Sequence, residues 1–128
     1  MKKAISTSAA PKAIGPYSQA IAAGGFLYIS GQLPIAAETG KMPDTIEAQA
    51  RASLQNIDSI LREAGYARND VVKTTVFLAD MADFDTVNKI YAEFFQGCLF
   101  PARVAIQAAR LPKDARVEIE SIAYKSAS

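Results

Sequence analysis

Arg103 has the chemistry and the position of a residue that could bind a carboxylate. It stands at the mouth of a short apolar segment, 104–109, whose composition is typical of a strand inside a sheet. Its planar guanidinium can hold a carboxylate through two parallel N–H···O bonds, a geometry that lysine does not reproduce. By strand alternation, the side chains of Arg103, Ala105 and Gln107 share one face.

Two carboxylates could lie near this arginine. Glu118 and Glu120 alternate with apolar residues in a predicted strand over 116–124, so they share one face of it. If this strand pairs with the strand that Arg103 opens, one glutamate lies beside the guanidinium. Such pairs are more often structural than functional, so spacing alone favours a structural ion pair over a site.

The rest of the composition excludes several kinds of catalysis. The chain contains no histidine, which removes Ser-His-Asp and Cys-His machinery and any ordinary zinc site. Neither of the common glycine-rich phosphate loops, GxGxxG or GxxxxGK[ST], occurs. Cys98 is the only cysteine and has no base beside it in sequence, so we interpret it as an incidental thiol. Catalysis would therefore rest on arginine, carboxylates, hydroxyls, backbone groups and water.

Length and charge indicate one domain, 1–128, that folds without disulfides or metal. Lys and Arg number 14 and Asp and Glu number 13, so no basic surface for nucleic acid or an anionic membrane is expected. The sequence shows no signal-peptide apolar region and no apolar stretch near the roughly 20 residues that span a bilayer. We therefore expect a cytoplasmic protein.

The elements that must position these groups alternate between strand and helix patterns. Gly24-Gly25 predicts a hairpin turn. Asp44, with Glu47 three residues later, predicts the N-cap of a helix that stops at Gly65, and Asp83 predicts the cap of a second helix. In chain order we expect a possible strand at 3–6, a loop at 8–17, strands 18–23 and 26–30, a loop at 31–40, a helix between 44 and 65, strand 71–79, a helix from 83 whose apolar side carries Phe84, Val87 and Tyr91, and strands 104–109 and 116–124.

This order predicts an α+β fold, with both helices on one face of a single mixed sheet. The other face of the sheet would then need cover. Its residues are expected to be small or apolar, so we predict that this face is buried against another subunit. The residues assigned to it are Ala20, Ala22, Thr75 and Ala105.

Four segments of the chain resemble the RidA family of reactive-intermediate deaminases, also called YjgF and, by an older label, endoribonuclease L-PSP or translation inhibitor. They are GPYSQAI, FLYISGQLP, VVKTTVFLADMADFDTVNKIYAEFF and FPARVAIQAARLPKDARVEIESIA, and the resemblance runs from about Ile5 to Ala123. It implies a chorismate-mutase-like α+β fold, assembled as a homotrimer with ligand clefts between subunits.

The resemblance also implies an activity. Members of this family hydrolyse unstable enamines and imines, such as 2-aminoacrylate and 2-aminocrotonate, to 2-keto acids and ammonia. These intermediates escape from pyridoxal-phosphate-dependent dehydratases, so a functional link to such enzymes is implied. No metal and no organic cofactor are implied.

Individual site residues follow from the same resemblance. Arg103 would bind the substrate carboxylate, and Glu118 would position or activate the attacking water. The remaining residues implied to contact the substrate are Tyr17, which would close the cleft, and Ser30, Gly31, Asn88 and Ala105.

One departure from the family pattern concerns Ala105. Many close relatives carry Ser-Cys directly after the motif arginine, and this chain carries Val104-Ala105. A thiol therefore cannot act at this position, and backbone groups at Ala105 would replace its contacts.

Two other classes of function stay open at this point. A cleft with a carboxylate-binding arginine would serve a non-catalytic 2-keto acid sensor, or a chaperone-like binding protein, equally well. RNA cleavage, which the older family label suggests, is disfavoured by the near-neutral charge and by the absence of histidine and of a basic-aromatic cluster.

Overall fold

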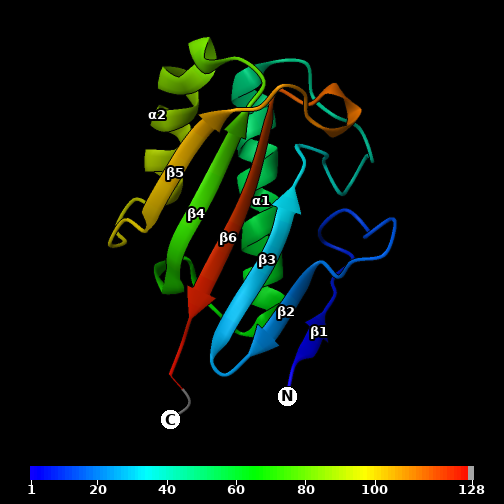
Figure 1. Cartoon of the computed structure of the whole chain (residues 1–128), viewed down its shortest axis with the longest axis vertical. Coiled ribbons are helices and arrows are strands. Elements are labelled where there is room, and N and C mark those ends of the chain that lie inside the picture. The colour runs from blue at the N-terminus through cyan, green and yellow to red at the C-terminus, as the bar shows by residue number, and fades with distance from the viewer. Residues whose placement is uncertain (127–128) are drawn as a thin grey trace.

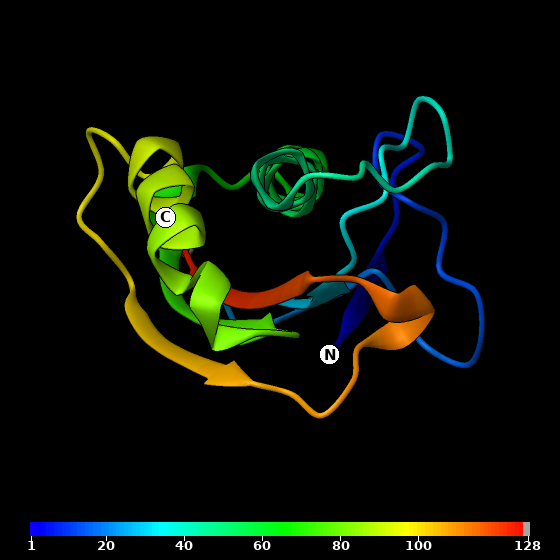
Figure 2. The same ribbon diagram turned by 90° about the horizontal axis from the view of Figure 1, so that it is seen from above.

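The computed structural model describes residues 1–126 and shows two helices packed on one face of a six-stranded sheet (Figures 1 and 2). The strand order is β1-β2-β3-β6-β4-β5. This arrangement confirms the predicted α+β class. The elements are β1 (Lys3–Ile5), β2 (Ala20–Ala23), β3 (Phe26–Gln32), α1 (Ile46–Ala64), β4 (Val71–Leu78), α2 (Phe84–Phe94), β5 (Ala102–Gln107) and β6 (Val117–Tyr124), with short 3₁₀ turns at Arg68–Asp70, Met81–Asp83 and Pro112–Asp114.

The order of the last three strands corrects one expectation. All neighbouring strands are antiparallel except β4 and β5, which are parallel. Because β4 lies between them, β5 and β6 do not pair. The segment that Arg103 opens was also expected inside the sheet, but β5 is an edge strand whose residues are all exposed except Ala105, which is half-buried.

The first helix begins one residue later than predicted, and the second begins at the predicted position without the expected cap bond. Thr45, not Asp44, caps α1: its Oγ1 accepts a hydrogen bond from the backbone N–H of Ala48 at 3.1 Å. Both residues are good caps, so the pattern alone does not choose between them. Asp83 does occupy the N-cap position of α2, but its carboxylate makes no cap bond and instead pairs with Arg116 at 3.0 Å.

Glycines mark the turns that sequence predicted. Gly24 and Gly25 both have positive φ, 57° and 86°, which a two-residue hairpin turn of this kind requires. Gly65 ends α1 in the left-handed conformation, as expected. Strand β2 starts later than predicted, at Ala20. The Gln19 side chain, just before this strand, bonds to the N-terminal loop, accepting from Thr7 N at 2.7 Å and donating to Pro11 O at 2.8 Å.

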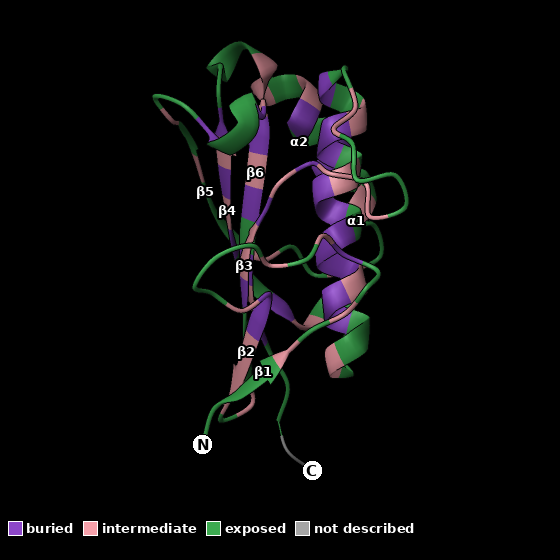
Figure 3. Cartoon of the chain, turned by 90° about the vertical axis from the view of Figure 1, so that its right-hand side faces the viewer, coloured by how far each residue is buried: buried purple, intermediate pink, exposed green. Residues whose placement is uncertain are grey.

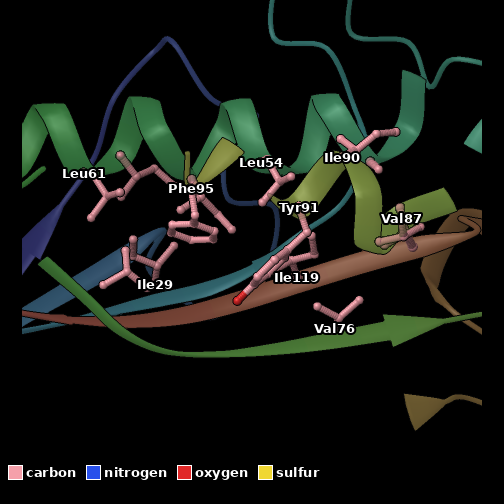
Figure 4. Packing of buried hydrophobic residues seen from close by; sticks show 14 of the residues in the cluster. Ile29, Leu54, Leu61, Val76, Val87, Ile90, Tyr91, Phe95 and Ile119 are labelled. Atoms are coloured by element: carbon pink, nitrogen blue, oxygen red, sulfur yellow. The ribbon is translucent and has the colours of Figure 1, made fainter. Parts of the chain in front are cut away.

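The core lies between the helices and one face of the sheet (Figure 4). Leu54, Ile57 and Leu61 recur at helical spacing along α1 and are at most 1% exposed. They pack against inward residues of the sheet, such as Ile119 at 0%, and against Phe95, which follows α2. No helix among the described residues combines the length and the apolar character that crossing a membrane would need.

Nothing within residues 1–126 covers the opposite face of the sheet (Figures 2 and 3). Of the four residues assigned to it from sequence, only Thr75 is there; Ala20, Ala22 and Ala105 belong to the helix-facing core. Side chains alternate between the two faces along each strand as predicted, but the alternation does not tell which face the helices cover. Large apolar side chains on this open face are 39–47% exposed: Phe26, Tyr28, Val104, Ile106 and Tyr124. Contiguous exposed apolar side chains often mark an interface, so burial of this face against another subunit remains our prediction.

Candidate functional site

Arg103 points from β5 toward α2. Its backbone stands opposite Thr74 in the parallel ladder with β4, and Thr74 lies on the helix-facing side of the sheet. The guanidinium Nη1 donates a hydrogen bond of 2.6 Å to the Oδ1 of Asn88 on α2. Both side chains are exposed, so two of the residues implied to contact the substrate are brought together at the surface.

Two aromatic rings of α2 complete the surroundings of this arginine. The Cζ of Arg103 lies 4.8 Å from the ring centre of Tyr91 and 5.5 Å from that of Phe84. Cation–π attraction acts within about 6 Å. Sequence reasoning had placed both rings on the apolar side of the helix and gave them no part in the site.

Ala105 lies on the same face as Arg103, two residues further along β5, and packs against the core. Gln107 shares that face, and its Oε1 accepts a hydrogen bond from the backbone N–H of Met81 at 2.7 Å. The intervening Val104 points to the open face and is 45% exposed. Of the pair that replaces Ser-Cys in this chain, only Ala105 therefore adjoins the arginine.

A second group of candidate residues gathers around Glu118 on β6. The half-buried Glu118 side chain lies directly against Gly31 of β3: a Cβ added at Gly31 would stand 2.6 Å from the Glu118 Oε2. Any side chain at position 31 would therefore push the carboxylate aside. This contact explains glycine at a position where the backbone itself does not require it, since no positive φ occurs there.

Ser30 precedes Gly31 on β3, and its hydrogen bonds connect it to the loop that carries Tyr17. The Ser30 hydroxyl donates to the backbone oxygen of Ser18 at 2.6 Å, and the Ser30 N–H donates to Gln19 O at 2.9 Å. These bonds hold the loop that carries Tyr17 next to β3. Tyr17 itself is 53% exposed, on a turn closed by its N–H bond to Gly15 O at 2.9 Å. Gly31 and Ser30 were expected in or beside a loop, but β3 continues through them to Gln32.

The environment of Glu118 favours its protonated form. Burial raises the pKa of this carboxyl, and the neighbouring Glu120 raises it further. Within residues 1–126, Glu118 takes part in no ion pair. A desolvated carboxylate without a counter-ion is a stronger base than an ordinary glutamate, as a residue that activates water needs to be.

The two groups lie on opposite faces of the sheet. Glu118 stands opposite Phe77 in the pairing of β6 with β4. Phe77 lies between the inward-facing Val76 and Leu78, so Phe77 and Glu118 both point to the open face. The condition for a glutamate of β6 to lie beside Arg103, pairing of their two strands, is therefore not met within one chain. Arg103, Asn88 and Ala105 form one half of the candidate site; Gly31 and Glu118 form the other, with Ser30 next to Gly31 in the chain and Tyr17 in the loop that Ser30 holds.

Comparison with known proteins identifies the family. The family model for endoribonuclease L-PSP matches residues 7–125. A RutC family protein of Pyrococcus horikoshii is 56% identical over 126 residues, which are 98% of this chain and 99% of that protein. The 2-iminobutanoate/2-iminopropanoate deaminase of Escherichia coli is 48% identical over 127 residues, again 98% and 99% of the two chains.

The chain belongs to the RidA family. A solved structure of another relative, E. coli TdcF with bound serine, matches with a TM-score of 0.94 at 44% identity, covering 97% of this chain and 99% of that one. The fold described above is thus the RidA fold, and the resemblance stated from the sequence motifs is confirmed.

Proposed function

We propose that this chain is an imine deaminase that hydrolyses 2-iminobutanoate, 2-iminopropanoate and their enamine forms to 2-keto acids and ammonia. The observation that carries the proposal is the exposed guanidinium of Arg103, which is held in place by Asn88 at 2.6 Å and has further N–H donors to offer a carboxylate. The 48% identity over nearly the whole chain to an enzyme of that name supports this substrate class.

The active unit in this proposal is a homotrimer with its sites between subunits. Two features of the chain support a site built from two copies. The Arg103 half and the Glu118 half face opposite sides of the sheet, and the face that carries Glu118 also exposes large apolar side chains. Docking that face on a neighbouring copy would bury those side chains and could bring the two halves together. The number three comes from the family resemblance.

The proposed mechanism needs no strong nucleophile, because C2 of a 2-imino acid is already electrophilic. Arg103 holds the carboxylate and fixes the position of C2. Glu118 accepts a proton from a water molecule as the water oxygen bonds to C2, and it passes this proton to the imine nitrogen as the C=N double bond opens, giving a tetrahedral carbinolamine. The carbinolamine hydroxyl then gives its proton to Glu118 as its oxygen forms the C=O double bond and the C–N bond breaks. The electrons of that bond leave with the nitrogen, which takes the proton from Glu118, so ammonia and the 2-keto acid are released and Glu118 is a carboxylate again.

The source of substrate is also part of the proposal. Enamines of this kind are released by pyridoxal-phosphate-dependent dehydratases, so the protein would remove their reactive products. No metal or organic cofactor takes part in the proposed reaction. The serine bound by E. coli TdcF supports recognition of a small molecule that carries a carboxylate.

The test is a coupled assay. A pyridoxal-phosphate-dependent threonine dehydratase generates 2-aminocrotonate in place, and the decay of the imine is followed with and without this protein. Arg103→Ala should remove the acceleration, whereas Arg110→Ala, which removes an exposed arginine paired with Asp114, should not. No acceleration by the wild type would contradict the proposal; if the wild type still binds 2-oxobutanoate, the protein is a sensor.

A further inference from the structure

We propose that Tyr91 and Phe84 are positioning residues for Arg103: together they form an aromatic cradle that, with Asn88, sets the orientation of the guanidinium toward the substrate carboxylate. The inference rests on the proposed function, because it assigns these two rings a part in the same site. The sequence predicted Phe84 and Tyr91 only as apolar residues of the second helix, with no part in the site.

One face of α2 supplies the whole cradle. Phe84, Asn88 and Tyr91 stand at positions i, i+4 and i+7, so they follow one stripe along the helix. All three contact the same guanidinium: Asn88 through its Oδ1 at 2.6 Å, Tyr91 and Phe84 through ring centres 4.8 and 5.5 Å from Cζ. A surface arginine carries a large rotamer entropy, and three contacts from one rigid helix reduce it before substrate binds.

The Tyr91 ring is held in place by a hydrogen bond to Thr74 on the sheet. Its hydroxyl and that of Thr74 are 2.6 Å apart, and the two residues are 4% and 1% exposed. Figure 4 shows the Tyr91 hydroxyl directed toward the sheet. The ring of Phe95 packs against the ring of Tyr91, with ring centres 4.9 Å apart. Tyr91 thus has little freedom to move away from Arg103.

Thr74 links the Tyr91 ring back to Arg103, because it stands opposite Arg103 in the pairing of β4 with β5. The contacts run from Arg103 on β5 to Tyr91 on α2, from Tyr91 to Thr74 on β4, and from Thr74 through the ladder back to Arg103. A shift of α2 relative to the sheet would therefore change the direction of the guanidinium. Three elements together determine where the carboxylate is bound.

The cradle leaves the charge and most donors of Arg103 available. Burial raises the pKa of Tyr91, against smaller lowering effects of the Thr74 hydrogen bond and of Arg103, so the phenol stays neutral and does not cancel the guanidinium charge. Asn88 accepts one of the five N–H groups, and the rings attract the cation without accepting conventional hydrogen bonds. A carboxylate can then take the remaining donors.

The first test measures the affinity for 2-oxobutanoate by calorimetry in a double-mutant cycle. Phe84→Leu and Tyr91→Leu should each weaken binding, by about threefold to tenfold for the loss of one cation–π contact. Tyr91→Phe keeps the ring and should lose less than about threefold. In an Arg103→Ala background the same ring substitutions should change affinity by less than about twofold, because the residue they position is gone. Equal losses in both backgrounds would overturn the inference, since a merely structural role predicts them.

A second test measures no activity and needs no substitution at a fully buried position. In the NMR spectrum, the Arg103 Nε–Hε signal, assigned by its loss in Arg103→Lys, should be displaced by the ring currents of Tyr91 and Phe84. Phe84→Leu, a change at a half-buried side chain, should move this signal toward those of the exposed arginines while the backbone signals of β4 and β6 stay in place. An unmoved Arg103 signal would overturn the cradle.

The two tests separate this inference from the function it rests on. A wild type that neither hydrolyses the imine nor binds 2-oxobutanoate contradicts the proposed function, and the NMR signal then decides the cradle alone. A fully active wild type whose Phe84→Leu and Tyr91→Leu variants bind 2-oxobutanoate unchanged contradicts the cradle alone.

Discussion

Arg103 and Glu118 project from opposite faces of the same sheet, with β4 between the strands that carry them. Arg103 stands opposite the inward-facing Thr74, whereas Glu118 stands opposite Phe77 on the open face. One chain thus presents each half of the candidate site to a different side. We therefore predict that a site using both residues is built from two copies of the chain.

Complementation between two inactive variants follows from this geometry. Arg103→Ala and Glu118→Ala should each lower imine hydrolysis by about a hundredfold when assembled alone, as expected for loss of a binding or base residue. Assembled together in equal amounts, the two chains form some interfaces in which one chain supplies Arg103 and its neighbour Glu118. In random mixtures about a quarter of the sites regain both residues, so about a quarter of the wild-type activity should return.

Native mass spectrometry should first establish that the mixed assemblies form, and each variant taken through the same refolding by itself serves as the control. Mixed assemblies without any recovered activity would contradict a site shared between copies.

Gly31→Ala should separate the position of Glu118 from the stability of the fold. The added Cβ would stand 2.6 Å from Oε2 and 3.0 Å from Cδ of Glu118, and these atoms lie near the free end of a flexible side chain. The carboxylate can turn away, so we expect the midpoint of urea unfolding to change little while the hydrolysis rate falls about tenfold or more. In a Glu118→Ala background, Gly31→Ala should have almost no further effect on the rate. A rate unchanged by Gly31→Ala in the otherwise wild-type chain would show that the carboxylate position does not matter.

Glu118→Gln should stabilise the chain at neutral pH. Because burial and Glu120 raise the pKa of Glu118 in the folded chain, the folded state binds more protons than the unfolded state between the ordinary and the raised value. Stability from this group therefore falls as pH rises through that range, and above it the full penalty is present. Glutamine is neutral at every pH and carries no such penalty.

The measurement is the thermal midpoint of Glu118→Gln against wild type from pH 7 downward. The variant should have the higher midpoint at pH 7, and its advantage should disappear below the ordinary pKa of glutamate, about 4.3. Glu63→Gln, at an exposed position of α1, serves as the matched control for replacing a glutamate by glutamine. A Glu118→Gln advantage that stays constant with pH would mean that charge is not its cause.

Thr45→Ala should weaken α1 at its first turn. Thr45 Oγ1 accepts the Ala48 N–H bond, and loss of such a cap costs about 1 kcal/mol of unfolding free energy. Asp44→Ala removes the residue that the capping-box pattern with Glu47 predicted as the cap and should cost less than about half of this. Urea unfolding of the two variants decides between them; a larger loss for Asp44→Ala would place the cap at position 44.

The sequence by itself determined the elements and the phase of side chains along each strand. The helical stripe of Leu54, Ile57 and Leu61 and the stop at Gly65 depend on a few neighbouring residues, so they could be predicted. The same is true of Arg103 and Ala105 sharing a face, since alternation is a property of one strand. Residue chemistry and alternation singled out Arg103 and Glu118, but Tyr17 and Asn88 came only from the motif resemblance, because no spacing rule selects them.

Only the tertiary structure decided what those faces meet. Strand order depends on pairing between segments far apart in the chain, and the insertion of β4 between β5 and β6 separates Arg103 from Glu118. The helices then cover one face, which turns Arg103 toward Asn88 and Tyr91 and leaves Glu118 on the other side with Gly31. A strand pattern is symmetric with respect to its two faces, and packing of the helices on one of them removes that symmetry.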